Sequence, residues 1–169
     1  MLADKKHLNE WRKEGRQAMR ADSPDVEIML RNFSETLMHD NVITNTSLDL
    51  GHKVVEGFTF KLYQPWYKAG PIGMVHDIGI TVDGKKVRRD DIHLILKGGQ
   101  RVMLYDARTI QDIWWNIVEP LVVFAACKGG LAAGNHQMEI ILAEEISAYY
   151  ELPLNMLMAQ VKTCLKLAQ

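Results

Sequence analysis

Two adjacent aromatic pairs offer the most specific chemistry in this sequence. Trp66 is followed by Tyr67 and Lys68 at a corner bounded by prolines, and Trp114 is followed directly by Trp115. Flat rings stack on the apolar faces of sugars and on other aromatic systems, so each pair could form a binding platform. Neighbouring side chains of an extended segment point to opposite faces, so at most one ring of each pair is expected in the core. The alternative interpretation is structural, with two rings in the core and the others filling an interface.

Metal binding and nucleophilic catalysis find little support in the residue spacing. The paired carboxylates Glu144 and Glu145 are neighbours on an expected strand and therefore point to opposite faces. No GxSxG motif supplies a nucleophile. The histidines are scattered, without the His-x-His spacing that lets imidazoles converge on one ion; they are His7, His39, His52, His76, His93 and His136. We therefore expect neither a catalytic residue nor a metal ligand in this chain.

The overall charge argues against two classes of partner. The sequence contains 20 Lys and Arg residues and 21 Asp and Glu residues, for a net charge of −1. Nucleic-acid and membrane-surface binders carry a clustered basic excess, so neither partner is expected. The densest basic cluster, Lys85, Lys86, Arg88 and Arg89, is expected to be the solvated tip of a hairpin. With two unpaired cysteines and no signal or membrane-spanning segment, the sequence predicts a soluble, cytoplasmic protein.

The elements that would position these residues are mainly strands. Asp83-Gly84 between two extended runs predicts a type I′ hairpin, because both central residues need positive φ. Residues 120–127 are apolar on both faces and predict a central, covered strand. Residues 41–53 are expected to form a loop or a weak edge strand. Short strands without intervening helices indicate a mainly β fold, specifically an antiparallel β-sandwich or jelly-roll-like domain.

Helices are expected at both ends of this β domain. Residues 1–25 form a charged helical extension, residues 26–152 the β-sandwich domain, and residues 153–169 a C-terminal amphipathic helix. The last assignment depends on Leu157, Val161 and Leu165, which recur at a spacing typical of one helix face.

The order of these signals resembles the small β subunit of bacterial C-glycoside deglycosidases. The resemblance covers Ile28 to Leu152. It is carried by the segments Val55 to Phe58, Trp66 to Gly70, Ile80 to Gly84, Trp114 to Glu119, Lys128 to His136 and Ile146 to Tyr149.

This resemblance implies an accessory subunit of a carbon–carbon lyase that acts on 3-oxo-C-glucosides, for instance those of flavonoids. The base and a divalent, Mn-like metal would lie in a catalytic α subunit, a TIM-barrel protein related to sugar isomerases. The present chain would hold no cofactor, and would stabilise that partner in a hetero-oligomer and help wall its pocket. The residues expected at the interface or pocket wall are Trp66, Tyr67, Lys68, Trp115 and His136.

Two other classes remain as alternatives. A free-standing carbohydrate-binding β-sandwich would use Trp66 or Trp115 as its sugar platform and would need no partner. An autonomous metal-dependent enzyme is disfavoured, because the sequence has no histidine cluster.

Overall fold

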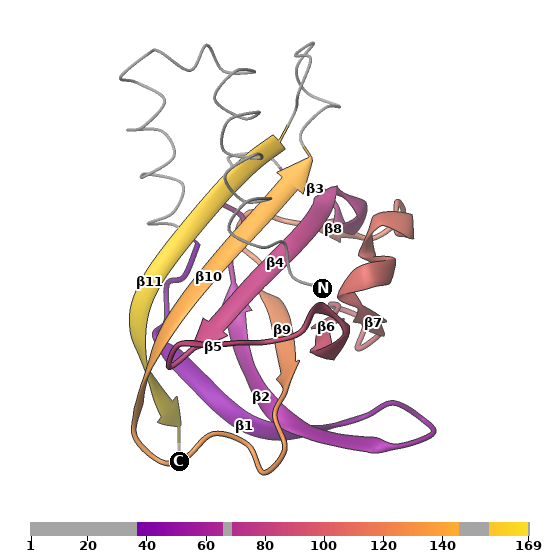
Figure 1. The fold of residues 1–169 in the computed structure, drawn as a ribbon. Helices are drawn as coiled ribbons and strands as arrows, with labels where there is room; N and C mark the ends of the chain where they lie inside the picture. Colours follow the sequence, from indigo (N-terminus) through magenta and orange to yellow (C-terminus); the bar gives the residue numbers. More distant parts are fainter. Residues whose placement is uncertain (1–36, 66–68, 146–155, 169) are drawn as a thin grey trace, which may run out of the picture.

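A nine-stranded sheet forms the body of the protein (Figure 1). The computed structural model describes residues 37–65, 69–145 and 156–168. The strands of this sheet are β1 (Val42–Asp49), β2 (Val54–Leu62), β4 (Val75–Val82), β5 (Lys85–Lys86), β6 (Ile92–Ile95), β7 (Arg101–Met103), β9 (Leu121–Ala126), β10 (Asn135–Glu145) and β11 (Met156–Ala168). Their spatial order is β5-β4-β10-β11-β1-β2-β9-β6-β7. A separate short ladder joins β3 (Gly70–Pro71) to β8 (Trp114–Trp115).

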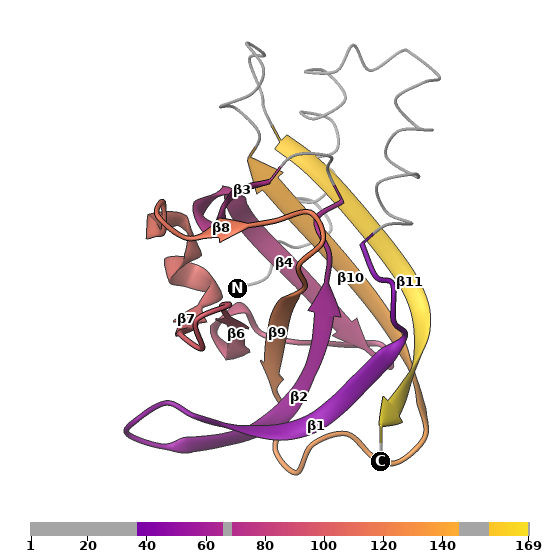
Figure 2. The ribbon, with the colours of Figure 1, turned by 180° about the vertical axis from the view of Figure 1, so that it is seen from behind.

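The sheet curls around a single apolar core, and the mainly β fold class is confirmed (Figures 1 and 2). The strands belong to one continuous sheet whose halves face each other across this core. Its interior is filled by alternate residues of the strands; the largest fully buried side chains of this core include Phe58, Leu62, Ile78, Ile80, Leu94, Met138 and Ile140. The β1–β2 hairpin extends beyond the curled body (Figure 2).

The 3-10 helix η3 (Leu104–Thr109) bridges the two ends of the strand order. It packs against β4 near one end and against β6 and β7 at the other. Two of its own residues, Leu104 and Ala107, are fully buried. Two shorter 3-10 helices, η1 (Ile72–Met74) and η2 (Arg89–Asp91), contact η3. The curled sheet is therefore completed by a short helical segment rather than by a further strand.

The prediction of a solvated basic hairpin tip is confirmed for three of its four residues and is wrong for Arg89. Lys85, Lys86 and Arg88 are exposed, whereas the Arg89 side chain is only 24% exposed and its Nε lies 3.2 Å from Asp77 Oδ1. Arg89 also donates a hydrogen bond to the His76 carbonyl at 3.0 Å and lies over the Tyr105 ring. Because a buried carboxylate is costly without a partner, Asp77 pairs with Arg89. This ion pair joins η2 to β4.

Two local predictions are confirmed and one is wrong. Asp83 and Gly84 have φ values of 47° and 77°, as a type I′ turn requires. β9 lies between β2 and β6 and is buried along most of its length. Residues 41–53, expected as a loop or weak edge strand, instead contain β1, which pairs with both β11 and β2.

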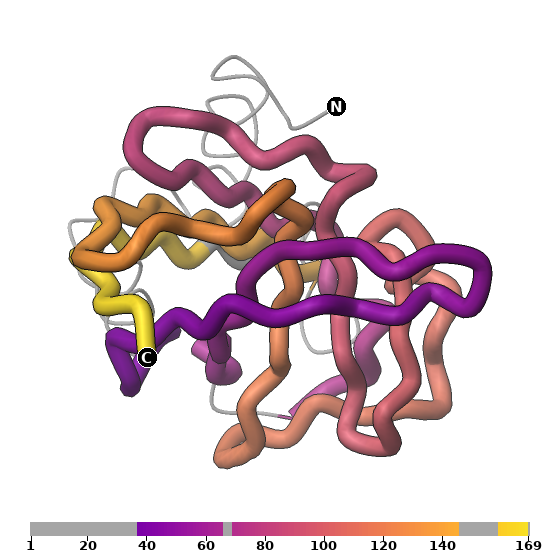
Figure 3. Tube along the Cα trace, turned by 90° about the horizontal axis from the view of Figure 1, so that it is seen from below, coloured from indigo at the N-terminus to yellow at the C-terminus, as the bar shows by residue number. Residues whose placement is uncertain are grey.

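The predicted C-terminal amphipathic helix is wrong, because residues 156–168 form β11. This strand pairs with β10 from Asn135 to Glu145 and runs parallel to β1 (Figure 3). From Ala159 to Ala168 its inward residues recur every second position and include Val161 and Leu165. Val161 and Leu165 fit the period of a helix as well as that of a strand. Pairing with two long strands, β10 and β1, makes this segment a strand. The predicted helix over residues 1–25 lies outside the described residues.

Candidate functional site

The aromatic pair Trp114-Trp115 lies on β8, whose partner is β3. Pro71 pairs with Trp114 and Gly70 with Trp115. Trp115 is 4% exposed and Trp114 is 53% exposed, so the expectation that at most one ring enters the core is confirmed for this pair. Trp66, Tyr67 and Lys68 lie outside the described residues, and their assignment to an interface stays a prediction.

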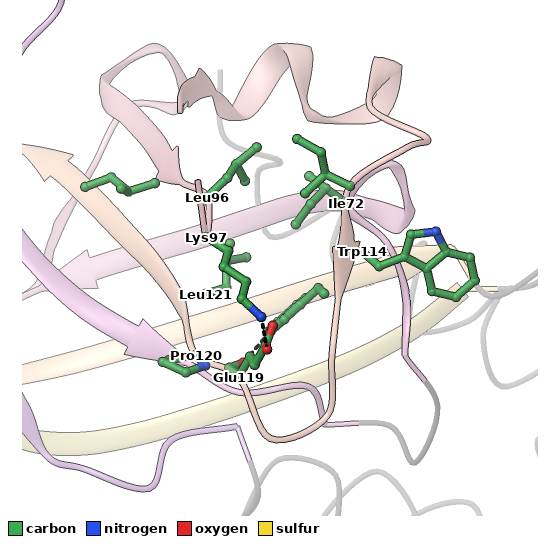
Figure 4. Close-up of a pocket in the computed structure, with 10 residues that line it drawn as sticks. Ile72, Leu96, Lys97, Trp114, Glu119, Pro120 and Leu121 are labelled. Atoms are coloured by element: carbon green, nitrogen blue, oxygen red, sulfur yellow. Dashed lines mark hydrogen bonds and ion pairs between the residues drawn. The ribbon is translucent and has the colours of Figure 1, made fainter. Parts of the chain in front are cut away.

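Beside Trp115 is a pocket of about 290 Å³, here called the tryptophan pocket (Figure 4). Four segments far apart in the sequence contribute to it: η1, the end of β6, β8 with its flanking residues, and the start of β9. The lining is mostly apolar and consists of Ile72, Ile95, Leu96, Lys97, Ile113, Trp114, Trp115, Glu119, Pro120 and Leu121. Backbone bonds from Ile72 N–H to the Ile113 carbonyl (2.8 Å) and from Gly73 N–H to the Ile110 carbonyl (2.7 Å) fix η1 against this wall.

The polar edge of the tryptophan pocket is built around Glu119. Its carboxylate accepts a hydrogen bond from Lys97 and another from Asn116 Nδ2 at 3.0 Å. The bond from Lys97, followed by that from Asn116, holds the pKa of Glu119 below its ordinary value. The Glu119 carbonyl accepts the indole N–H of Trp115 at 2.9 Å. A charged pair and a fixed indole ring therefore stand at the edge of an apolar cavity.

This arrangement is suited to binding. Across the described ranges, no three His, Cys, Asp or Glu side chains converge closely enough to hold a metal ion. Apolar walls with a few polar groups at one edge are typical of sites that bind small molecules or partner side chains.

The described residues contain no helix that is long and apolar enough to cross a membrane.

His136, the other predicted site residue in the described ranges, lies away from the tryptophan pocket. It is the second residue of β10, beside the turn that follows β4, whereas Gly70 and Trp115 lie near the start of β4. Its Nδ1 is 2.7 Å from Asp83 Oδ2 and its Nε2 is 2.8 Å from the Ala132 carbonyl. Both ring nitrogens thus face acceptors, which favours the doubly protonated ring. The bonds to Asp83 and then Ala132 raise the pKa of His136.

The His136–Asp83 pair should make stability depend on pH. We expect Asp83→Asn to lower the Tm by a few degrees at about pH 5, because the protonated imidazole loses its anionic partner. The raised pKa of His136 means that its stabilisation is complete below 6.5 and is lost as pH rises through the folded value. The Tm difference should therefore shrink towards about pH 9 in circular dichroism melts.

Asparagine is a clean replacement here, since it tolerates the positive φ of Asp83 and can still accept the Gln137 N–H bond. Asp90→Asn, at an exposed carboxylate of η2, is the matched control. An equal Tm difference at both pH values would contradict the assigned ion pair.

A second candidate site, formed by Glu144 and Gln64, was not predicted from the sequence. Glu144 is 1% exposed, Gln64 is 5% exposed, and both lie in the interior of the curled sheet. Burial raises the pKa of Glu144 to about 8, and the nearby Gln64 side chain opposes this shift. Even so, neither carboxyl oxygen of Glu144 nor Gln64 Oε1 has a hydrogen-bond partner in the described part of the chain. An irregularity in the β10–β4 pairing falls between Ala143 and Glu144.

A signal for Glu144 was present in the alternation of β10. His136, Met138, Ile140 and Leu142 occupy every second position of this strand, and all four are buried. The same parity places Glu144 inward. The two adjacent carboxylates do separate, with Glu145 reaching Arg108 at 3.1 Å on the outer side.

Residues 33–149 match the family described as C-glycoside deglycosidase beta subunit. The chain belongs to this family. A C-glycoside deglycosidase beta subunit of Eubacterium cellulosolvens is 28% identical over 92 residues, which are 53% of this chain and 60% of that protein. A 3'-dehydrocarminate deglycosidase beta subunit of Microbacterium sp is 23% identical over 90 residues, 53% of this chain and 67% of that protein. The alignment thus spans less than two thirds of the first of these relatives.

The resemblance noted in the sequence is confirmed. The stretch that matches the C-glycoside deglycosidase beta subunit family contains every residue of the tryptophan pocket, together with Gln64, His136 and Glu144. β11 lies beyond it.

Proposed function

We propose that this chain is the accessory β subunit of a deglycosidase complex that cleaves the carbon–carbon bond of 3-oxo-C-glucosides. The observation that carries the proposal is the family match over residues 33–149. The names of the two relatives, both beta subunits of deglycosidases, support it. A subunit of this kind needs a partner, which we propose to be a metal-dependent catalytic α subunit of the sugar-isomerase type.

The proposed reaction is a β-elimination. The ketone at C3 acidifies the hydrogen at C2, and a base of the catalytic subunit removes that proton. The electron pair left at C2 forms the C1–C2 double bond, while the bond from C1 to the aglycone breaks and the aglycone takes up a proton. A divalent, Mn-like metal bound by the catalytic subunit would stabilise the negative charge that develops on the sugar oxygens. No step of this scheme uses a residue of the present chain as base or metal ligand.

The contribution of this chain would be to stabilise the catalytic subunit and to wall its pocket. Apolar side chains are exposed on β8 and in the connection from β8 to β9, next to the tryptophan pocket: Trp114 of β8 is 53% exposed, and Ile117 and Val118 of the connection are 43% and 84% exposed. Adjacent exposed apolar residues are typical of protein-binding surfaces. We propose that this connection contacts the catalytic subunit.

Co-expression with the isomerase-like protein encoded beside this chain tests the proposal. We expect size-exclusion chromatography with light scattering to show a hetero-oligomer that cleaves a 3-oxo-C-glucoside, which neither chain cleaves alone. Val118→Asp should weaken assembly roughly tenfold or more, since it places a charge in an apolar contact. Val54→Asp, at a 66% exposed valine on β2, is the matched control and should assemble normally.

A chain that ignores the isomerase-like protein would contradict the proposed function. If that chain bound glucosides by itself, the free-standing carbohydrate-binding module would become the better interpretation. Equal weakening by Val118→Asp and Val54→Asp would contradict the proposed contact alone.

A further inference from the structure

Glu144 is a buried carboxyl whose negative charge the described residues do not compensate. Its side chain is 1% exposed, and neither carboxyl oxygen has a hydrogen-bond partner in the described part of the chain. Burial raises the pKa of Glu144, and the Gln64 side chain opposes that shift. A buried carboxyl without a partner is far more stable with its proton than without it. The closed sheet is therefore built for the protonated form of Glu144.

The cations beside Glu144 are already paired with other carboxylates. The titratable and charged side chains on the neighbouring elements are His76 and Asp77 of β4, Arg89 of η2, Arg108 of η3 and Glu145 of β10. Arg89 Nε lies 3.2 Å from Asp77 Oδ1, and Arg108 donates to Glu145 at 3.1 Å. None of these five groups is among the causes of the raised pKa of Glu144. An ionised Glu144 would thus have no counter-ion among the described residues.

Glu144 lies where β4 and β10 have little pairing left. It is the penultimate residue of β10, and the register of β10 against β4 shifts between Ala143 and Glu144. Beyond that shift, Glu144 and Val75 form the last described pair of the two strands (Figure 1). Gln64 likewise lies two residues after the end of β2. Strand ends with few backbone hydrogen bonds open at a lower free energy than the middle of a sheet.

We propose that release of the Glu144 proton separates β4 from β10 at this end while the rest of the sheet stays folded. The segments that separate, residues 75–77 and 143–145, are here called the β4–β10 end. Separation brings the carboxylate into water, where it needs no counter-ion, and breaks only the pairing at and beyond the register shift. The sheet thus contains a pH-sensitive element, which does not depend on the proposed function.

The direction of the pH effect follows from the proton. The closed end binds a proton at Glu144 that the open end releases, so rising pH favours the open end. Since the pKa of Glu144 is raised from 4.5 to about 8, the closed end is fully favoured below pH 4.5. Between that pH and about 8, the equilibrium constant for opening should rise about tenfold for each pH unit.

Hydrogen exchange of the full-length chain, followed for each amide by NMR, tests this opening. After correction for intrinsic exchange rates, we expect amides of the β4–β10 end to show the tenfold rise for each pH unit between about pH 5 and 7.5. These amides should also be at least about a hundredfold less protected than those of β9, which open only when the whole sheet unfolds. Low urea concentrations should leave their opening unchanged, because a local opening exposes little surface.

Glu144→Gln keeps the shape of the side chain and removes its titration. Opening of the β4–β10 end should then be independent of pH and, at about pH 7, roughly a hundredfold or more rarer than in the wild type. Glu144→Met, which has neither a charge nor a hydrogen-bonding group that needs a partner, is a second variant and should also lose the pH dependence. Glu145→Gln, at a 40% exposed carboxylate, is the matched control and should keep the wild-type pH dependence.

Two results would overturn the inference. If amides of the β4–β10 end are as protected as those of β9 and respond equally to urea, Glu144 releases its proton only when the whole sheet unfolds. If the pH dependence of the opening persists in Glu144→Gln and Glu144→Met, another group drives it.

Discussion

Glu144→Gln is expected to remove a loss of stability that the wild-type chain suffers as pH rises from 4.5 to about 8. The buried carboxyl has its pKa raised from 4.5 to about 8, so the folded state holds a proton that the unfolded state releases. Stability therefore falls by about 1.4 kcal/mol for each pH unit within that window. Near pH 7 the variant should be more stable by roughly 3 kcal/mol, because the introduced amide carries no charge to ionise.

A protonated Glu144 also accounts for the buried oxygens of Glu144 and Gln64 that have no hydrogen-bond partner in the described part of the chain. A neutral Glu144 can donate a hydrogen bond, and Gln64 Oε1 is a buried acceptor without a partner in the described part of the chain. The introduced amide can donate to the same oxygen, so the substitution keeps the polar pair and removes only its titration.

Urea unfolding at a series of pH values measures this effect. The control is Glu145→Gln, which alters the neighbouring carboxylate on the opposite face, where the side chain is 40% exposed. We expect that variant to keep the wild-type slope. Parallel stability curves for wild type and Glu144→Gln would show that Glu144 is ionised in the folded protein.

Gly57→Ala should be among the most destabilising conservative changes in the sheet. A Cβ at this position would lie 2.2 Å from the Ala125 carbonyl oxygen and 2.7 Å from the Phe124 ring. The oxygen belongs to the backbone of β9, where residues 57–62 of β2 pair with residues 121–126. A methyl group can enter only if the ladder shifts, so we expect a loss of about 3 kcal/mol.

The free energy of unfolding in urea checks this expectation. Gly51→Ala is the comparison, because no heavy atom lies within 4 Å of a Cβ there and its φ is +85°. That variant should lose only about 1 kcal/mol, from backbone strain. If the two variants lose the same stability, the close approach of β2 and β9 at Gly57 is not the cause.

Features with a local cause were predictable from the sequence. The Asp83-Gly84 turn follows from two residues that tolerate positive φ, and the covered strand β9 follows from a run that is apolar on both faces. β11 was not predictable in this way, because Val161 and Leu165 fit a helix as well as a strand. Its state depends on pairing with residues 135–145 and with β1, contacts that no local pattern encodes.

The candidate site also contains features that could be predicted from the sequence and features that could not. The separation of Trp114 from Trp115 could be predicted, since neighbouring side chains of an extended segment point to opposite faces. Lys97 and Glu119 could not, because their meeting depends on the end of β6 coming next to the start of β9. Arg89 was misjudged for a related reason: its partner Asp77 lies on β4, and only the packing of η2 brings the two together.

The parallel pairing of β1 with β11 has a consequence for synthesis on the ribosome. It joins Val42 to Lys166, so the strand beside the first described strand is the last described strand to be made. Until β11 emerges, β10 and β1 each present an unpaired edge, and exposed edges invite association with other chains. The curled sheet can thus close only after nearly all of this sequence has been translated. A shortened chain that ends at the family boundary, residue 149, would leave that gap open permanently.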